Sequence, residues 1–75
     1  MTTFKLPHKW TQLLIALPES GMGYQLVKVF LKSGKVLNRQ KVLNSSILLV
    51  EPQEKISVEE IEKIELEKFN LQLHV

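Results

Sequence analysis

Residues 24–43 read YQLVKVFLKSGKVLNRQKVL, and this stretch decides the fold. Its first eight residues, Tyr24 to Leu31, are rich in β-branched and aromatic side chains, which favour extended chain. Lys32-Ser33-Gly34 then fits a three-residue hairpin loop, because Gly34 accepts a positive φ at no steric cost. With a return strand over Lys35 to Leu43, the stretch predicts a β-hairpin.

The length of the loop sets which residues of the hairpin face each other. A three-residue loop pairs Leu31 with Lys35, Val29 with Leu37 and Val27 with Arg39. A two-residue loop would place Lys28 opposite Arg39, and like charges directly opposite each other are destabilising. We therefore expect the longer loop.

An amphipathic helix is expected before the hairpin, from Pro7 to Leu17. Four apolar side chains share one face of this helix: Trp10, Leu13, Leu14 and Leu17. Pro7 suits the first helical position, and Pro18 disfavours helical geometry at Leu17. Trp10 is expected to anchor the helix to the sheet.

After the hairpin, Asn44-Ser45-Ser46 predicts a turn and Ile47 to Val50 a third strand, whose consecutive aliphatic residues indicate burial on both faces. Pro52 ends this strand. Ser57 and Glu60 then match a capping box.

Two structures fit the residues after this capping box. One is a helix over Val58–Phe69, and the other is a single helical turn over Val58–Ile61 followed by a strand. The strand turns Ile64 and Leu66 inward and Lys63, Glu65 and Glu67 outward. We favour the strand because it aligns the apolar side chains better.

The last residues alternate between apolar and polar in the opposite parity. The apolar ones are Phe69, Leu71, Leu73 and Val75. A bulge or turn near Lys68 would be needed to bury both sets.

These elements predict a mainly β fold with one N-terminal α-helix, as a small SH3-like antiparallel barrel. The alternative is an α+β open antiparallel sheet with one or two helices. The 75 residues suffice for one small domain. We expect its core at residues 6–67, with an apolar tail at residues 68–75 that serves as an extra edge strand.

The composition excludes several classes of chemistry. The chain has no cysteine, no aspartate and two histidines, so disulfides, thiolate zinc sites and Asp-dependent triads are absent. We expect no enzyme, no cofactor and no metal. The longest apolar run, Leu13–Leu17, is far shorter than a membrane helix requires, so we expect no membrane contact and a cytoplasmic location.

Basic residues gather on the hairpin, while most glutamates follow residue 50. The candidates for contact with an anion or a nucleic acid are Lys28, Lys32, Lys35, Arg39 and Lys41. On a regular strand, Arg39 and Lys41 share a face with Lys35 and form a basic stripe. The nearby aromatics Tyr24 and Phe30 are expected to point away from the polar face.

Gly21-Met22-Gly23 is the most unusual loop of the chain. Two glycines separated by one residue can expose successive N–H groups to a small anion, so Gly21 and Gly23 are candidate anion contacts. Otherwise they let the chain turn sharply while Met22 and Tyr24 pack or lie at a recognition surface.

The run LPESGMGYQ at residues 17–25, followed by the hairpin, resembles a group of small bacterial proteins with an LP-x-x-GMGYQ-x-V core and a later I-x-x-I close. The matching residues are Leu17, Pro18, Gly21, Met22, Gly23, Tyr24, Gln25, Val27, Gly34, Ile61 and Ile64. The resemblance covers residues 6–67 and implies one compact domain, with no activity attached.

The chain is thus expected to be a non-enzymatic protein–protein interaction module, with homodimerisation as one form. The candidate partner-binding residues are Met22, Tyr24, Phe69, Leu71 and Leu73, because an apolar alternating tail can add to a sheet edge. The alternatives are nucleic-acid binding through the basic hairpin and small-anion binding at the Gly21–Tyr24 loop.

Overall fold

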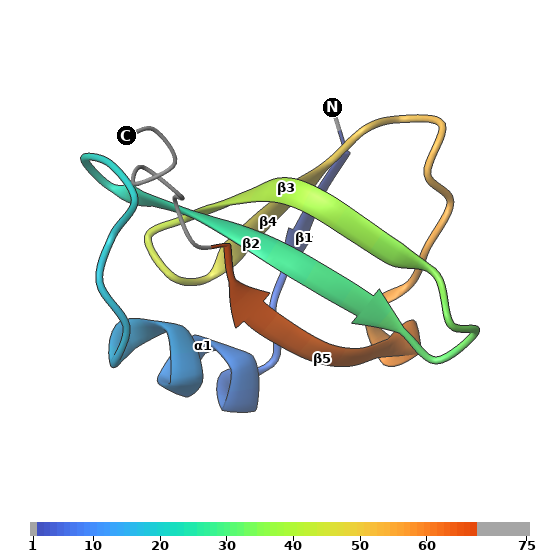
Figure 1. The fold of residues 1–75 in the computed structure, drawn as a ribbon, viewed down its shortest axis with the longest axis horizontal. Coiled ribbons are helices and arrows are strands. Elements are labelled where there is room, and N and C mark those ends of the chain that lie inside the picture. The colour runs from blue at the N-terminus through green and yellow to red at the C-terminus, as the bar shows by residue number, and fades with distance from the viewer. Residues whose placement is uncertain (1, 68–75) are drawn as a thin grey trace, which may run out of the picture.

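A computed structural model describes residues 2–67, which form one antiparallel sheet and one α-helix (Figure 1). The strands are β1 (Thr2–Lys5), β2 (Tyr24–Leu31), β3 (Val36–Leu43), β4 (Ile47–Val50) and β5 (Ile61–Leu66), in the order β1-β4-β3-β2-β5. The helix α1 (His8–Ile15) lies between β1 and β2, and a short 3₁₀ turn, η1 (Val58–Glu60), precedes β5. The predicted mainly β fold with one N-terminal helix is confirmed.

The sheet is not closed over the residues described. The strand β1 pairs with β4 alone and β5 pairs with β2 alone, so these two strands form its edges. The topology is therefore that of the open antiparallel sheet rather than of a fully closed barrel. The expected tail strand at Phe69, Leu71, Leu73 and Val75, with its turn near Lys68, falls outside the described residues.

The three-residue loop of the central hairpin is confirmed. The N–H of Leu31 donates to the carbonyl of Lys35 at 2.8 Å, and Val29 faces Leu37. Val27, however, faces Gln40 instead of Arg39, because a β-bulge adds one residue to β3.

The bulge resolves a conflict of parity within β3. Leu37 and Val42 are both buried, although they are five positions apart and a regular strand would turn them to opposite faces. Arg39 takes φ 55° at the irregularity, and the shift returns Val42 to the core.

The last third of the chain is one turn and a strand, as predicted. Ser57 and Glu60 form both bonds of the capping box, and β5 excludes a continuous helix over Val58–Phe69. A second irregularity, opposite Phe30 and Leu31, lets Ile61 and Ile64 both enter the core despite their odd spacing.

One strand was not predicted. Thr2–Lys5 pairs with β4, so the sheet extends beyond the expected core of residues 6–67. The following residue, Leu6, is buried, and its N–H donates to the carbonyl of Ser46 at 2.8 Å. Four residues carry too weak a pattern to be recognised alone; only pairing with a buried neighbour identifies them.

The helix α1 rests on the inner face of the sheet. Leu14 is fully buried and Trp10 and Leu17 pack partly buried against the core, as expected for the anchor, but Leu13 is 40% exposed. The helix ends at Ile15, two residues before the predicted end, and its contact with the sheet is narrower than the predicted apolar face because Leu13 turns toward solvent.

The buried polar residue that joins the two layers is Gln25, which is 1% exposed. Its side-chain Nε2 lies 2.9 Å from the carbonyl oxygen of Leu14 and 3.2 Å from those of Leu17 and Pro18. These carbonyls belong to the end of α1 and the chain that follows, where helical partners run out. The Gln25 amide therefore caps the helix from the sheet.

Replacing this amide tests its role. We expect Gln25→Ala to lower the free energy of unfolding by about 1–3 kcal/mol, because it removes the amide that donates to the end of α1 and leaves a cavity at a fully buried position. Denaturant unfolding followed by circular dichroism measures the change. Gln12→Ala, on the exposed side of α1, is the matched control and should change stability by about 0.5 kcal/mol or less. Equal losses in the two variants would contradict the role of Gln25.

Candidate interaction surface

The two faces of β2 have different surroundings. Gln25, Val27, Val29 and Leu31 are buried, whereas Tyr24, Leu26, Lys28 and Phe30 lie half-buried on the opposite face, here called the outer face. The expectation that Tyr24 and Phe30 point away from the polar face was wrong, since both share the face of Lys28. The buried residues of β2 lie on the same face as Gln25. A sequence pattern does not reveal this face, because it counts a glutamine as exposed.

Strand pairing places the outer-face residues in two adjacent rows across the sheet. One row runs Lys5, Ile47, Leu43, Tyr24, and the next runs Thr3, Leu49, Lys41, Leu26. Five of these residues are half-buried and apolar or aromatic, and they surround an exposed lysine. We call this set the outer-face patch: Tyr24, Leu26, Leu43, Ile47 and Leu49, with Lys41 among them.

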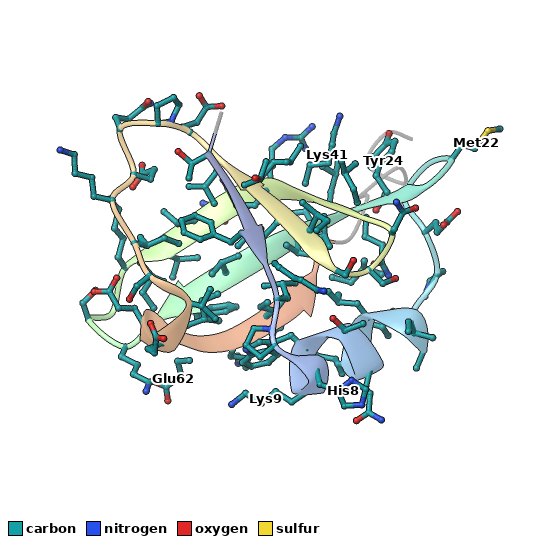
Figure 2. All side chains as sticks on the ribbon, turned by 180° about the vertical axis from the view of Figure 1, so that it is seen from behind. His8, Lys9, Met22, Tyr24, Lys41 and Glu62 are labelled. Carbon is teal, nitrogen blue, oxygen red and sulfur yellow. The ribbon has the colours of Figure 1, made fainter. Side chains whose placement is uncertain are left out.

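Lys41 lies at the middle of the patch. Its Nζ stands 4.8 Å from the centre of the Tyr24 ring, and its cross-strand neighbours are Leu26 and Leu49. Figure 2 shows Tyr24 and Lys41 together, on the side of the sheet away from α1. Over residues 2–67, the ion pairs within 4.0 Å are Lys35 with Glu54 and Lys63 with Glu65, so Lys41 contacts no carboxylate there.

The Tyr24 side chain lies directly over Gly21. A Cβ added to Gly21 would collide with the far end of the Tyr24 ring and with its hydroxyl, so any other residue at this position displaces the ring. Met22 lies at the tip of the loop between them, where it is 97% exposed and projects into solvent (Figure 2). Of the predicted partner-binding residues, the structure thus brings Met22 and Tyr24 to one end of the sheet.

The N–H groups of both glycines in this loop are already used within the chain. Gly21 donates to the carbonyl of Tyr24 at 3.2 Å, and Gly23 donates to the carboxylate of Glu19 at 3.3 Å. A carboxylate thus occupies the place of the anion that was considered for this loop. Gly23 takes φ 80°, in agreement with its expected role in a sharp turn.

The basic residues of the hairpin do not form the continuous stripe considered from the sequence. Lys28 and Lys41 lie on the outer face, while Lys35 binds Glu54 at 2.7 Å and Lys32 follows the end of β2. The bulge at Arg39 breaks the alternation, so Lys41 no longer shares a parity with Lys35.

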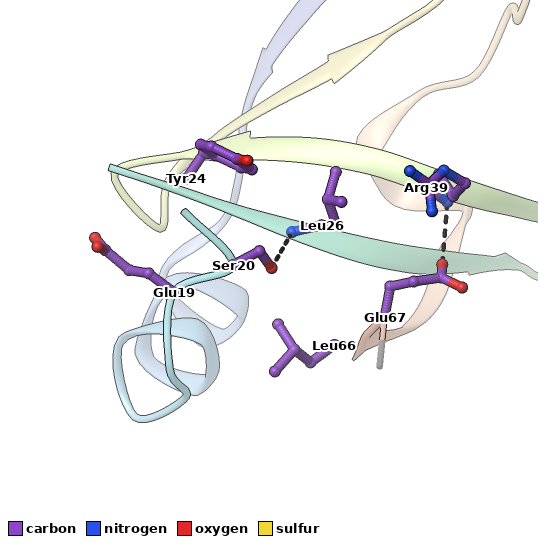
Figure 3. A pocket seen from close by; sticks show the side chains of 7 residues that line it. All are labelled: Glu19, Ser20, Tyr24, Leu26, Arg39, Leu66 and Glu67. Carbon is purple, nitrogen blue, oxygen red and sulfur yellow. Dashed lines mark hydrogen bonds between the residues drawn. The ribbon is translucent and has the colours of Figure 1, made fainter. Parts of the chain in front are cut away.

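A cleft of about 620 Å³ adjoins the patch (Figure 3). It is lined by Glu19, Ser20, Tyr24, Leu26, Arg39, Leu66 and Glu67. The backbone of Leu26 is satisfied here on both atoms: its N–H donates to Ser20 Oγ at 2.8 Å and its carbonyl accepts from the N–H of Glu67 at 2.7 Å. Glu67 Oε1 in turn accepts from the N–H of Arg39 at 3.1 Å.

The aliphatic members of the patch were missed from the sequence. Leu26, Leu43, Ile47 and Leu49 look like ordinary strand residues, and only the pairing of three strands brings them together with Lys41. The available signal was the four-residue aliphatic run of β4, of which Leu48 and Val50 are buried and the other two half-buried.

The described residues contain no cluster of metal ligands. No group of three or more His, Asp or Glu able to hold a metal occurs among residues 2–67. His8 is exposed at the start of α1, and His74 lies outside the described part of the chain. Within that part, no helix is long and apolar enough to cross a membrane.

The contact between Gly21 and Tyr24 can be tested by a double-mutant cycle. We expect Gly21→Ala to cost about 1–3 kcal/mol of stability, because the added methyl group forces the Tyr24 ring out of place. In a Tyr24→Ala background the same change should cost about 0.5 kcal/mol or less. The side-chain NMR shifts of Lys41 should report the lost ring in both cases. A cost of Gly21→Ala that is independent of Tyr24 would contradict the contact.

Comparison with models of protein families, with curated proteins and with solved structures finds no match to this chain. The resemblance to proteins with an LP-x-x-GMGYQ-x-V core therefore stays a prediction.

Proposed function

We propose that the chain is a non-enzymatic protein–protein interaction module and that the outer-face patch is its docking surface. The observation that carries the proposal is that five half-buried apolar or aromatic side chains from three strands adjoin on a sheet face that no described element covers. Covering such side chains removes apolar surface from water, which is the main driving force of protein association.

The geometry of the patch supports a folded protein partner. Tyr24 supplies a large ring with few rotatable bonds, and its contact with Gly21 restricts the ring before any partner arrives. Tyrosines surrounded by apolar neighbours are typical of the residues that carry most of the energy of an interface. Met22 adds an adaptable apolar side chain at the rim.

The charges of the patch favour a partner different from the chain itself. A two-fold pairing of the patch with a second copy would bring Lys41 and Lys5 of both copies into one interface. Like charges brought together in this way oppose association. Homodimerisation through the tail at Phe69, Leu71 and Leu73 is a separate hypothesis, on residues outside the described part of the chain.

Binding of single-stranded nucleic acid is the second candidate. It is favoured by one observation: Lys28 lies between Tyr24 and Phe30 on the outer face, and Lys63 Nζ stands 4.6 Å from the centre of the Phe30 ring. Lysines interleaved with aromatic rings suit a phosphate backbone with stacked bases. We rank it second because lysines cover both rings and because the patch is mainly aliphatic.

Photocrosslinking in the native host tests the docking surface. A benzoylphenylalanine placed at Leu49 should yield discrete protein adducts, whereas the same group at Ile15 should yield none. Ile15 is the matched control, because it is a 68% exposed aliphatic residue on α1, away from the patch. The predicted cytoplasmic location is tested in the same experiment, by the cell fraction in which the adducts are found.

The outcomes separate the two candidates. Adducts that a protease removes and a nuclease leaves intact support the protein partner. Adducts removed by nuclease, with affinity for a dT oligonucleotide that falls steeply as salt rises, would replace it by nucleic-acid binding. Equal adducts from both positions, or none from Leu49, would contradict the patch as a docking surface.

A further inference from the structure

The position of Lys41 restricts what can cover the outer-face patch. Its neighbours across the strands are Leu49 on one side and Leu26 on the other, and its ammonium lies over Tyr24. A partner surface that contacts these apolar residues must therefore also cover the ammonium group. A partner could leave a charge at the rim of the patch in water, but it must cover Lys41.

Covering the ammonium group removes its water. A charge taken out of water is strongly unfavourable unless an opposite charge and hydrogen bonds replace the solvent. The charged residues around it supply no such replacement. Lys5 and Lys28 have the same sign, and Glu65 is paired with Lys63 at 3.0 Å. Of the two acids in the adjoining cleft, Glu67 accepts from the N–H of Arg39 at 3.1 Å and Glu19 accepts from the N–H of Gly23 at 3.3 Å. The Tyr24 ring offsets part of the loss by its cation–π contact.

We propose that the partner presents a carboxylate, set within an apolar surface, to the Lys41 ammonium. The inference rests on the proposed function and names the partner chemistry of the same patch. The choice of a protein carboxylate over a phosphate follows from the neighbours. Ile47, Leu43 and Leu49 offer aliphatic surface, which suits apolar side chains better than the polar backbone of a nucleic acid.

The Lys41 side chain is preorganised for this contact. Gly21 lets the Tyr24 ring lie close against the loop, and the ring in turn holds the ammonium at 4.8 Å. A cation restricted before binding loses less freedom when it meets its counter-ion. The carboxylate therefore adds specificity to an association that the apolar side chains drive.

Two matched peptides test the proposal on the full chain. Both are 18-residue amphipathic helices of Leu, Ala and Gln; one has a single Glu at the centre of its apolar face and the other has Gln there. Binding is followed through the backbone amide shifts of Tyr24, Leu26 and Lys41. We expect the Glu peptide to bind about five- to tenfold more tightly than the Gln peptide.

Lysine variants identify the contact. Lys41→Met should remove the preference for Glu while keeping the shifts at the patch, and Lys41→Arg should keep the preference. Lys32→Met, at an exposed lysine beyond the end of β2, should behave as the unmodified chain. Circular dichroism confirms that each variant folds.

The outcomes distinguish the inference from the proposed function. If both peptides shift the patch equally, the carboxylate is wrong and the docking surface stands. If neither peptide shifts the patch, both are wrong. A dT oligonucleotide is tested in the same way. If it displaces the Glu peptide and binds the unmodified chain more tightly than the Lys41→Met variant, the counter-ion is a phosphate and the carboxylate proposal is overturned.

Discussion

The hydrogen bonds of the Gln25 side chain are the constraint on which the rest of the structure depends. Its amide reaches the carbonyls of Leu14 and Pro18, so one residue in the middle of the sheet closes the end of α1. On its other side, Oε1 accepts a hydrogen bond from Ser45 Oγ at 3.4 Å, in the turn between β3 and β4. A buried polar group is tolerated only when it is satisfied in this way. Because Gln25 must point inward, Tyr24 and Leu26 must point outward. The position of the outer-face patch therefore follows from the burial of a glutamine.

Two irregularities let a small sheet keep its buried core residues on one face. The bulge at Arg39 and the shift opposite Leu31 each change the parity of a strand midway. Without them, either Leu37 or Val42 would face water. The bulge at Arg39 also places Lys41 on the outer face between Leu26 and Leu49. The core and the patch are thus two results of one adjustment, and neither can be altered by a register change without harm to the other.

Much of the fold could be predicted from local patterns. The limits of β2 and β4, the three-residue loop and the capping box at Ser57 all follow from side-chain type and turn chemistry. The strand Thr2–Lys5 could not, because it is defined by its pairing with β4. The outer-face patch could not be predicted either, because its members are far apart in sequence and meet only through strand pairing. In addition, the buried face of β2 includes a glutamine, which a periodicity argument counts as exposed. Local sequence predicts single helices and strands, whereas a surface made of several strands can be predicted only when the register between the strands is known.

The hydrogen bond from the Leu26 N–H to Ser20 Oγ has a consequence for how the molecule behaves at high concentration. Beyond the last residue of β5, the backbone of β2 would otherwise offer an unpaired donor and acceptor beside apolar side chains, which is the arrangement that seeds fibrils. The serine hydroxyl takes the donor, and the N–H of Ser20 itself takes the carbonyl of Tyr24 at 2.9 Å. At this point of β2 the apolar side chains of the outer face therefore stand beside a backbone whose hydrogen bonds are already made within the chain, so another strand cannot add there.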